Sequence, residues 1–451
     1  MKRPVNEVFD LLRRYESRNV TFIEPDGSWP IVWKRAKGVH VWDEAGRRYL
    51  DLTAAFGVAA AGHANPRVVL AGQRQMGELL HAMGDVHPHR LKAELARELS
   101  RLTFERWSGD FGAGAVSGKT LFCNSGFEAV EAALKTGMLA TGRSGVVAFH
   151  GAYHGLGYGA LNVTHRSHFR GHFVEQLGGF GCFVPFPRSS EDLPPIEVQI
   201  KRLLRSKRIG AILVEPVQGR GGVNIPPVKF LPMLRKLCDE AKALLIVDEV
   251  FTGFGRTGKW FACEHSGTMP DIVCLGKALT GGFPLAACVG TAEIMDHAWP
   301  QSTGEAIHTS TYLGHPVGCA MALAQIKEIR RLKLPERSAR LGRWLGDELS
   351  RLPSRKGIRL ESRCLGLMAG VELTTKNGEA GTALSLKLMK EMLRKGILVL
   401  PEGEHSNVIS LIPPLTVTRV QLAKAAEALA ESLSDPACLA QSGGKGWLDP
   451  Q

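Results

Sequence analysis

Lys277 stands alone in a stretch that is otherwise almost entirely apolar or small, "IVCLGKALTGGFPLAACVG" (272–290). An unpaired ammonium group is costly to remove from water, so a lysine in such surroundings tends to give up its proton. Glycines at 276, 281 and 282 flank this lysine and leave space beside it. Lys277 is therefore a candidate nucleophile.

Four other short apolar runs end in polar or aromatic residues. Each run is followed by residues that can do chemistry: 119–123 by Ser125 and Gly126, 144–149 by Tyr153 and His154, 211–214 by Glu215 and Gln218, and 243–247 by Asp248 and Glu249. Ligands of open parallel sheets bind at the carboxyl ends of the strands. If these runs are parallel strands, the sequence predicts that their end residues gather around Lys277.

Each of these residues has a structural explanation when taken alone. Ser125 can cap a helix, and Asp248 and Lys277 can form a buried ion pair. Together they match pyridoxal 5'-phosphate, whose phosphate binds a helix N-terminus, whose ring stacks on an aromatic side chain and pairs its nitrogen with a carboxylate, and whose aldehyde forms a Schiff base with lysine. We therefore predict a pyridoxal-phosphate site on Lys277.

Two glycine-rich motifs do not fit the contexts that their functions need. "AGAVSGKT" (113–120) resembles a phosphate-binding loop, but a strand follows it where a helix is required. "GFGRTG" (253–258) resembles a dinucleotide-binding fingerprint, but the sequence after it does not have a helical pattern. Neither motif is interpreted as functional.

The rhythm of apolar runs and amphipathic segments predicts an α/β protein with a mostly parallel sheet covered on both faces. The segment 38–57 predicts a β-hairpin around "DEAGR", and the chain from about 330 predicts a smaller α+β domain. We expect an N-terminal segment at 1–65 that packs on the small domain, a large cofactor-binding domain at 66–325, a small domain at 326–440 and a poorly ordered tail at 441–451.

The composition is that of an ordinary globular chain. Of 451 residues, 44% are hydrophobic and 22% are charged, and no apolar run is long enough for a membrane helix. The N-terminus lacks the apolar core of a secretion signal, and nine cysteines without a C-x-x-C pair indicate reduced thiols, so we expect a cytoplasmic location. The net charge of +12 is scattered, which favours a basic surface over nucleic-acid binding.

Several stretches in order resemble the class III aminotransferases. They are "CNSGFEAVEAALKTGMLATGR", "FHGAYHG", "ILVEPVQGRGG", "IVDEVFTGFGRTG", "CLGKALTGGFPLAACVG", "TYLGHPVGCAMALA" and "SLIPPLTVT", and the match spans roughly residues 35 to 430. The resemblance implies fold type I, with a mostly parallel seven-stranded sheet between helices in the large domain. It also implies transfer of an amino group from an amine or ω-amino acid to a 2-oxo acid.

The resemblance also implies residue roles. Lys277 would carry the Schiff base and move the proton, and Asp248 would pair with the ring nitrogen. The other cofactor contacts would come from residues on both ring faces, at the phosphate and in a neighbouring subunit: Ser125, Gly126, Phe127, Tyr153, His154, Val250 and Thr311. Because Thr311 would reach the phosphate of the neighbouring subunit, the resemblance implies a homodimer with shared active sites.

The sequence departs from the family pattern in two places. Phe251 stands where many members have a glutamine that bonds the cofactor's 3-hydroxyl, and Gln218 is a candidate substitute. Ser410 stands where many members have an arginine that pairs with the glutamate of "EPVQG", here Glu215, and with a substrate carboxylate. With Glu215 unpaired, we expect mono-acids to serve at least as well as 2-oxoglutarate, and Arg220 is an alternative carboxylate site.

Three alternatives stay open at this stage. An aminomutase of the glutamate-semialdehyde type would need no added oxo acid. An acetylornithine or 4-aminobutyrate transaminase would use the same scaffold with another donor, and a non-catalytic pyridoxal-phosphate-binding protein would not turn over its cofactor. We expect no metal, nucleic-acid or membrane partner.

Overall fold

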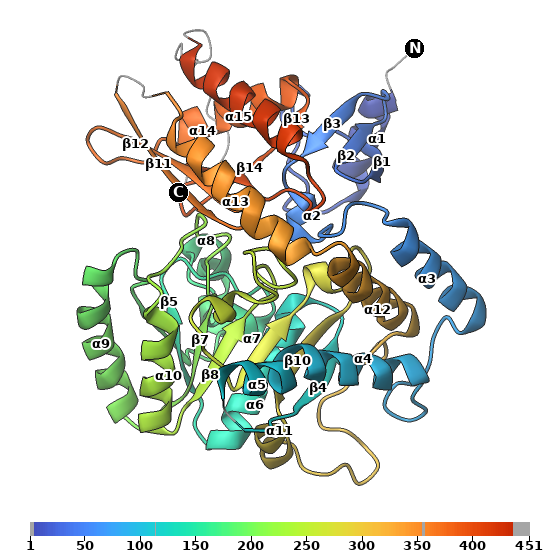
Figure 1. Cartoon of the computed structure of the whole chain (residues 1–451), viewed down its shortest axis with the longest axis vertical. Coiled ribbons are helices and arrows are strands. Elements are labelled where there is room, and N and C mark those ends of the chain that lie inside the picture. The colour runs from blue at the N-terminus through green and yellow to red at the C-terminus, as the bar shows by residue number, and fades with distance from the viewer. Residues whose placement is uncertain (1–3, 113, 354–356, 436–451) are drawn as a thin grey trace.

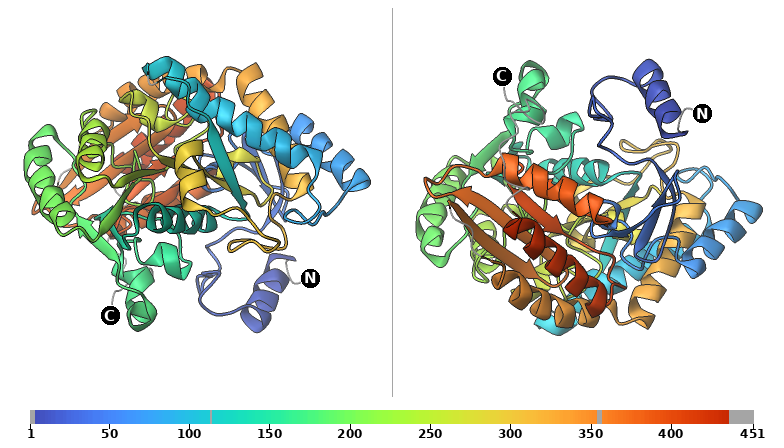
Figure 2. Two further views of the ribbon diagram at one scale, coloured as in Figure 1. Left: turned by 90° about the horizontal axis from the view of Figure 1, so that it is seen from below. Right: turned by 90° about the horizontal axis from the view of Figure 1, so that it is seen from above.

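The computed structural model describes residues 4–112, 114–353 and 357–435. A large central sheet with its helices forms the lower part of the view in Figure 1, and the C-terminal elements lie above it with the N-terminal strands beside them. Two further views show the same arrangement from below and from above (Figure 2). The predicted tail at 441–451 and Cys438 lie outside the described residues.

The central sheet has seven strands in the order β4-β10-β9-β8-β7-β5-β6. They are β4 (Gly118–Cys123), β5 (Gly145–Phe149), β6 (Gly181–Val184), β7 (Ile209–Val214), β8 (Leu244–Asp248), β9 (Ile272–Leu275) and β10 (Ala286–Thr291). The pairs β5–β6, β5–β7, β7–β8 and β8–β9 are parallel, whereas β10 runs antiparallel to β4 and β9. The predicted mostly parallel sheet is confirmed.

Helices cover both faces of this sheet. Successive strand residues point to opposite faces, and the strands carry apolar side chains on both, so each face packs against helices. In β7, Ala211 and Leu213 belong to the apolar cluster of helix α6 (Gly126–Thr141). The alternating residues Ile212 and Val214 belong to the other cluster, with α9 (Leu193–Arg205) and α10 (Phe230–Ala241). The remaining helices of this part are α3 (Pro66–Glu78), α4 (Arg90–Ser100), α5 (Arg106–Phe111), α7 (Tyr158–Leu161), α8 (Ser167–Arg170), α11 (Ala292–Ala298) and α12 (Pro316–Arg331).

A second sheet lies toward the C-terminus. Its antiparallel strands follow the order β11-β12-β15-β14, with bounds β11 (Ile358–Leu365), β12 (Met368–Thr375), β14 (Leu400–Glu402) and β15 (Val408–Leu411). Helices α13 (Leu334–Ser350) and α14 (Thr382–Arg394) pack on this sheet, and α15 (Arg419–Ser434) packs on those two helices. This part therefore has the α+β character predicted for it.

The N-terminal segment forms a third, smaller sheet. Its antiparallel strands are β1 (Trp33–Lys37), β2 (His40–Asp43) and β3 (Arg48–Asp51), and the C-terminal strand β13 (Ile397–Leu398) pairs in parallel with β3. Helices α1 (Pro4–Tyr15) and α2 (Ala54–Gly57) flank these strands. The predicted hairpin around "DEAGR" is confirmed, whereas the domain limits at 65, 325 and 440 stay predictions.

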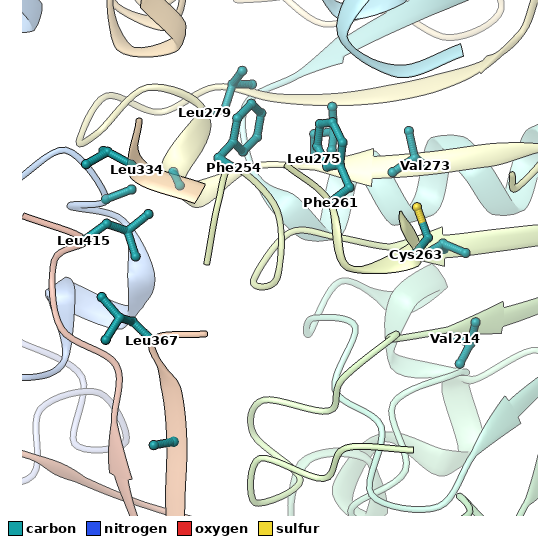
Figure 3. Packing of buried hydrophobic residues seen from close by; sticks show 14 of the residues in the cluster. Val214, Phe254, Phe261, Cys263, Val273, Leu275, Leu279, Leu334, Leu367 and Leu415 are labelled. Atoms are coloured by element: carbon teal, nitrogen blue, oxygen red, sulfur yellow. The ribbon is translucent and has the colours of Figure 1, made fainter. Parts of the chain in front are cut away.

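One apolar cluster connects the large sheet with the C-terminal part. It includes Val214 and Val273 of the large sheet, Leu334 at the start of α13, Leu367 beside β12 and Leu415. Figure 3 shows these side chains at close range. Because protein interiors are close-packed, this shared core fixes the C-terminal sheet relative to the edge of the large sheet.

The structure agrees with the rejection of the two glycine-rich motifs. The strand β4 begins inside "AGAVSGKT", and turns rather than an α-helix follow "GFGRTG", as expected from the sequence. The eight described cysteines are free thiols. Within 4–112, 114–353 and 357–435, no helix is long and apolar enough to cross a membrane, and no three potential ligands form a metal-binding group.

Candidate active site

The carboxyl ends of β4, β5, β7, β8 and β9 share one edge of the large sheet, and a pocket of about 410 Å³ opens there. It is lined by Gly126, Phe127, Tyr153, His154, Gly155, Leu156, Glu215, Arg220, Asp248, Val250, Phe251 and Lys277. Nine of the twelve predicted site residues are in this lining. The three that are not are Ser125, Gln218 and Thr311.

Lys277 follows β9 after one residue, Gly276, and lines the pocket. Its backbone φ is 41°, in the left-handed region that non-glycine residues rarely adopt. The Nζ atom lies 3.8 Å from the centre of the Phe251 ring. Burial lowers the pKa of this lysine to about 8, against the opposing effects of Asp248 and Glu215. Lys277 therefore carries much more neutral, nucleophilic amine near neutral pH than an ordinary lysine does.

Asp248, the last residue of β8, is fixed from two sides. Its Oδ2 atom lies 2.8 Å from Nδ1 of His154, and its Oδ1 atom accepts a hydrogen bond from the backbone N–H of Val250 at 3.0 Å. The next acid, Glu249, is fully buried elsewhere and accepts hydrogen bonds from the Thr252 hydroxyl and the Cys263 backbone. Of the two consecutive acids, only Asp248 can face a ligand in the pocket.

The N-terminus of α6 has the features of an anion site. Ser125 is the N-cap residue but makes no capping bond, and its buried hydroxyl has no partner among the described residues. The backbone N–H groups of the first turn of a helix also lack intrahelical partners. A Cβ at Gly126 would lie 2.9 Å from Val250, so only glycine fits there without displacing that side chain. These groups fit the phosphate of pyridoxal phosphate.

Tyr153 and Phe251 contribute two of the aromatic rings that line the pocket. Burial raises the pKa of the Tyr153 hydroxyl, and the ring packs edge-on against Phe169. Phe251 is enclosed by two glycines, since a Cβ at Gly219 or at Gly57 would lie 2.0 Å or 2.5 Å from its ring. The pocket thus has one aromatic ring on the Tyr153 side and another against Lys277.

Gln218 does not line this pocket. Its Nε2 donates to the His150 carbonyl at 2.7 Å, and its Oε1 accepts from Asn224 at 3.0 Å. Both ends of the amide are therefore engaged in holding the 218–224 loop. Many family members use a glutamine at position 251 to bond the cofactor's 3-hydroxyl. This geometry does not support Gln218 in that role.

Comparisons with known proteins agree with this arrangement. The model of the family Aminotransferase class-III matches residues 23–433. A 5-aminovalerate aminotransferase of Pseudomonas aeruginosa is 37% identical over 90% of this chain and 94% of its own length. An acetylornithine aminotransferase of Methanosarcina acetivorans is 37% identical over 88% of this chain and 90% of its own. The chain belongs to the class-III aminotransferase family.

A solved structure supports the same conclusion. An amine transaminase from an uncultivated Pseudomonas species, in its PLP-bound form, is 30% identical and has a TM-score of 0.81, covering 93% of this chain and 98% of its own. The class-III aminotransferase described here has the fold-type I architecture and is a transaminase, an enzyme that moves an amino group from an amino donor to a 2-oxo acid. The family resemblance stated from the motifs is confirmed.

Glu215 of this class-III aminotransferase is not unpaired, and the sequence-based premise is wrong on this point. Its Oε1 atom accepts the backbone N–H of Tyr153 at 3.0 Å, and its Oε2 atom accepts that of Gly219 at 3.1 Å. Burial raises the pKa of this carboxyl to about 7. Ser410 is buried and donates to the Leu400 carbonyl at 3.0 Å, so it does not face Glu215. The expected preference for mono-acids rests on an unpaired Glu215 and loses that support here.

Arg220 of the class-III aminotransferase has a partner that sequence reasoning missed. Its Nη1 atom lies 2.9 Å from Oε2 of Glu402, which is 3% exposed. Glu402 is separated from Arg220 by 182 residues and ends strand β14 of the C-terminal sheet. Gly155 and Leu156 of the lining were also missed, because neither type carries a recognisable chemical signal.

Thr311 lies in an exposed turn before α12, outside the pocket of its own chain. The neighbouring Ser310 accepts a hydrogen bond from Asn124 at 3.3 Å, so this turn lies against the segment that leads into α6. A role of Thr311 in a second subunit stays a prediction.

Proposed function

We propose that this class-III aminotransferase uses pyridoxal 5'-phosphate bound to Lys277 to transfer an amino group from an amine or ω-amino acid to a 2-oxo acid. The observation that carries the proposal is the meeting, at one pocket, of the Lys277 amine, the Asp248–His154 pair and the start of α6 at Gly126. The unpartnered Ser125 hydroxyl precedes Gly126 at this helix start. When bound, pyridoxal phosphate supplies an aldehyde that joins amino groups and a protonated ring that withdraws electrons from the bond being broken.

The residues around the pocket divide the task of holding this group. Ser125, Gly126 and Phe127 at the start of α6 bind the phosphate, for which the unpaired hydroxyl and backbone N–H groups are suited. Asp248 keeps the ring nitrogen protonated, and His154 orients the Asp248 carboxylate through its 2.8 Å contact. Tyr153 and Val250 pack on the two ring faces in this proposal, since both line the pocket.

Lys277 also moves the proton in the proposed reaction. With its pKa lowered to about 8, Nζ can take a proton from the substrate carbon that bears the amino group and return it at a neighbouring position. Asp248 and Glu215 beside it are each 6% exposed, so their oxygens have little contact with water.

The donor class follows from the relatives. Their names cover an ω-amino acid, an acylated diamino acid and amines. 5-Aminovalerate and acetylornithine share a primary amine on an unbranched carbon chain, and we propose this class for the donor and a 2-oxo acid for the acceptor.

The assembly and location are proposed together with the activity. A homodimer is proposed because the turn that carries Thr311 is exposed and lies beside the α6 segment that binds phosphate in this proposal. A cytoplasmic location is proposed from the cysteine pattern of the sequence.

A single-turnover experiment tests the proposed function. Protein loaded with pyridoxal phosphate is mixed with 5-aminovalerate or pentylamine without an oxo acid, and the bound cofactor is extracted and weighed by mass spectrometry. Conversion to the amine form of the cofactor in the wild type, and its loss by orders of magnitude in Lys277→Ala, is expected. An unchanged cofactor with every amine would contradict the proposal.

A further inference from the structure

The Arg220–Glu402 pair bridges the two sides of the pocket. Arg220 belongs to the loop after β7 and Glu402 to strand β14 of the C-terminal sheet. The Arg220 side chain is 33% exposed and lines the pocket with Lys277, whereas Glu402 is nearly inaccessible. Arg220 can therefore turn toward a ligand without leaving the pocket, but Glu402 stays behind it.

The backbone on both sides of this pair is held rigidly. The Arg220 carbonyl accepts the N–H of Gly403 at 3.0 Å. Arg363 of β11 donates to the carbonyls of Gly222 at 2.8 Å and of Val223 at 3.2 Å. The Arg220 loop is thus fastened to the C-terminal sheet, so only the long side chain is free to change partner.

A second arginine lies near the same carboxylate. Arg166 is 7% exposed, and its Nη2 atom donates to the backbone carbonyl of Glu404 at 3.0 Å. Among the residues that the structure describes, Arg166 forms no ion pair with a carboxylate. Burial raises the pKa of Glu402, and Arg220 and Arg166 act against that rise. Burial and the neighbouring Arg220 charge lower the pKa of Arg166.

The charges at this end of the pocket do not balance. Arg220 contacts the buried carboxylate of Glu402, and Arg166 lies close enough to act on the same carboxylate, while Glu404 is exposed to water. A buried cation without a counterion is costly, and an additional carboxylate beside Arg220 reduces that cost. If Arg220 turns to such a carboxylate, Glu402 keeps Arg166 as its neighbouring cation, so no buried charge is left alone.

We propose that Arg220 binds a carboxylate at the end of the substrate remote from the reacting amine, with Glu402 as the internal anion that occupies Arg220 when the substrate has none and Arg166 as the cation that stays near Glu402. This inference rests on the proposed transaminase function and names its substrate class. The pocket accepts chains with a terminal carboxylate and also uncharged chains, because the resident pair closes when the carboxylate is absent.

Two donors of equal length separate this role from a structural one. 5-Aminovalerate and pentylamine both present a primary amine on five carbons, but only the first carries a terminal carboxylate. In Arg220→Ala, kcat/KM for 5-aminovalerate should fall about tenfold or more, chiefly through KM, because a charge-assisted bond is lost. The ratio of this value to that for pentylamine should also fall about tenfold, because the unpaired Glu402 affects both donors, whereas the lost bond affects only 5-aminovalerate.

A binding measurement gives a second readout. Calorimetric titration with glutarate, a five-carbon dicarboxylate without an amino group, should show binding weakened about tenfold or more in Arg220→Ala. Glu402→Gln should act in the opposite direction and bind glutarate more tightly than the wild type, because Arg220 is no longer neutralised. Arg330→Ala is the matched control, since it removes an exposed Arg–Glu pair with Glu98, outside the pocket, and should leave both values unchanged.

The outcomes are distinct. Equal losses for both donors in Arg220→Ala, or glutarate binding weakened in Glu402→Gln, would overturn the carboxylate site. The second variant decides the matter if Arg220→Ala does not fold. A third outcome separates the two proposals. If the wild type converts neither donor, but Arg220→Ala still binds glutarate more weakly than the wild type does, the transaminase proposal is overturned and the carboxylate site stands.

Discussion

His154 Nδ1 lies 2.8 Å from Asp248 Oδ2, and both side chains are buried beneath the pocket that Lys277 enters. The pair joins the carboxyl ends of β5 and β8, which are separated in the sheet by β7. This contact orients the Asp248 carboxylate, and the Val250 backbone N–H holds its other oxygen. The carboxylate therefore stands in a defined direction before any ligand binds.

Replacement of Asp248 by asparagine should reduce turnover more than cofactor retention. The amide keeps the shape of the side chain but loses the charge that keeps the ring nitrogen protonated in the proposed reaction. Loss of one preorganised electrostatic group lowers kcat by about 100-fold or more. Steady-state kinetics checks this, with Glu249→Gln as the control, because that buried acid bonds to Thr252 and lies outside the pocket. Wild-type turnover in Asp248→Asn would make Asp248 a structural acid.

Ser125→Ala should affect the empty and the loaded protein in opposite directions. The unpaired buried hydroxyl destabilises the cofactor-free chain by about 1 kcal/mol or more, so its removal should raise Tm. The affinity for pyridoxal phosphate should fall about tenfold, while that for pyridoxal, which lacks the phosphate, should not change. Ser385→Ala is the control, because this serine has an equally unpaired hydroxyl but lies in α14. Equal loss of affinity for both ligands would place the hydroxyl away from the phosphate.

Gly219→Ala should displace the Phe251 ring, which lies under the Lys277 amine. The new Cβ would lie 2.0 Å from the Phe251 ring, so the ring must move or the fold must strain, at about 1–3 kcal/mol. We expect a lower Tm and a lower rate with every donor. Gly77→Ala, in the exposed part of α3 with no atom within 4 Å, should instead stabilise by about 0.5–1 kcal/mol. Unchanged kinetics in Gly219→Ala would mean that Phe251 does not shape the reacting site.

The stability of the cofactor-free protein should depend on pH through Lys277. Its pKa is lowered to about 8 in the fold, whereas an unfolded lysine titrates near about 10.4. Between these values the unfolded chain holds a proton that the folded chain has released, so stability rises with pH, and below about pH 8 the buried charge destabilises fully. Lys277→Met should therefore raise Tm more at pH 7 than at pH 10. An equal shift at both values would show that the amine is not desolvated.

Much of the site could be predicted because parallel strands bring their carboxyl ends to one edge. Asp248 ends the apolar run of β8, and Lys277 follows that of β9, so neighbouring strands place them together. The start of α6 at Gly126 could be predicted for the same reason, since it directly follows β4. These residues are found from local patterns alone.

The sequence-based predictions that were wrong or incomplete concern side chains whose partners are backbone groups or residues distant in sequence. Glu215 is bonded by the Tyr153 and Gly219 backbone N–H groups, which any residue type could supply. Gln218 turns away because Asn224 and a carbonyl hold its amide. The Glu402 partner of Arg220 comes from a sheet whose position is set by a shared core rather than by sequence spacing.

The most direct test of the account is the location of the cofactor bond. Protein loaded with pyridoxal phosphate is reduced with borohydride, digested, and analysed for the peptide that carries the cofactor mass. We predict the label on Lys277, at about one per chain, and its loss in Lys277→Ala. A label on another lysine, or none on a protein that still transaminates, would contradict the central claim that Lys277 holds the cofactor.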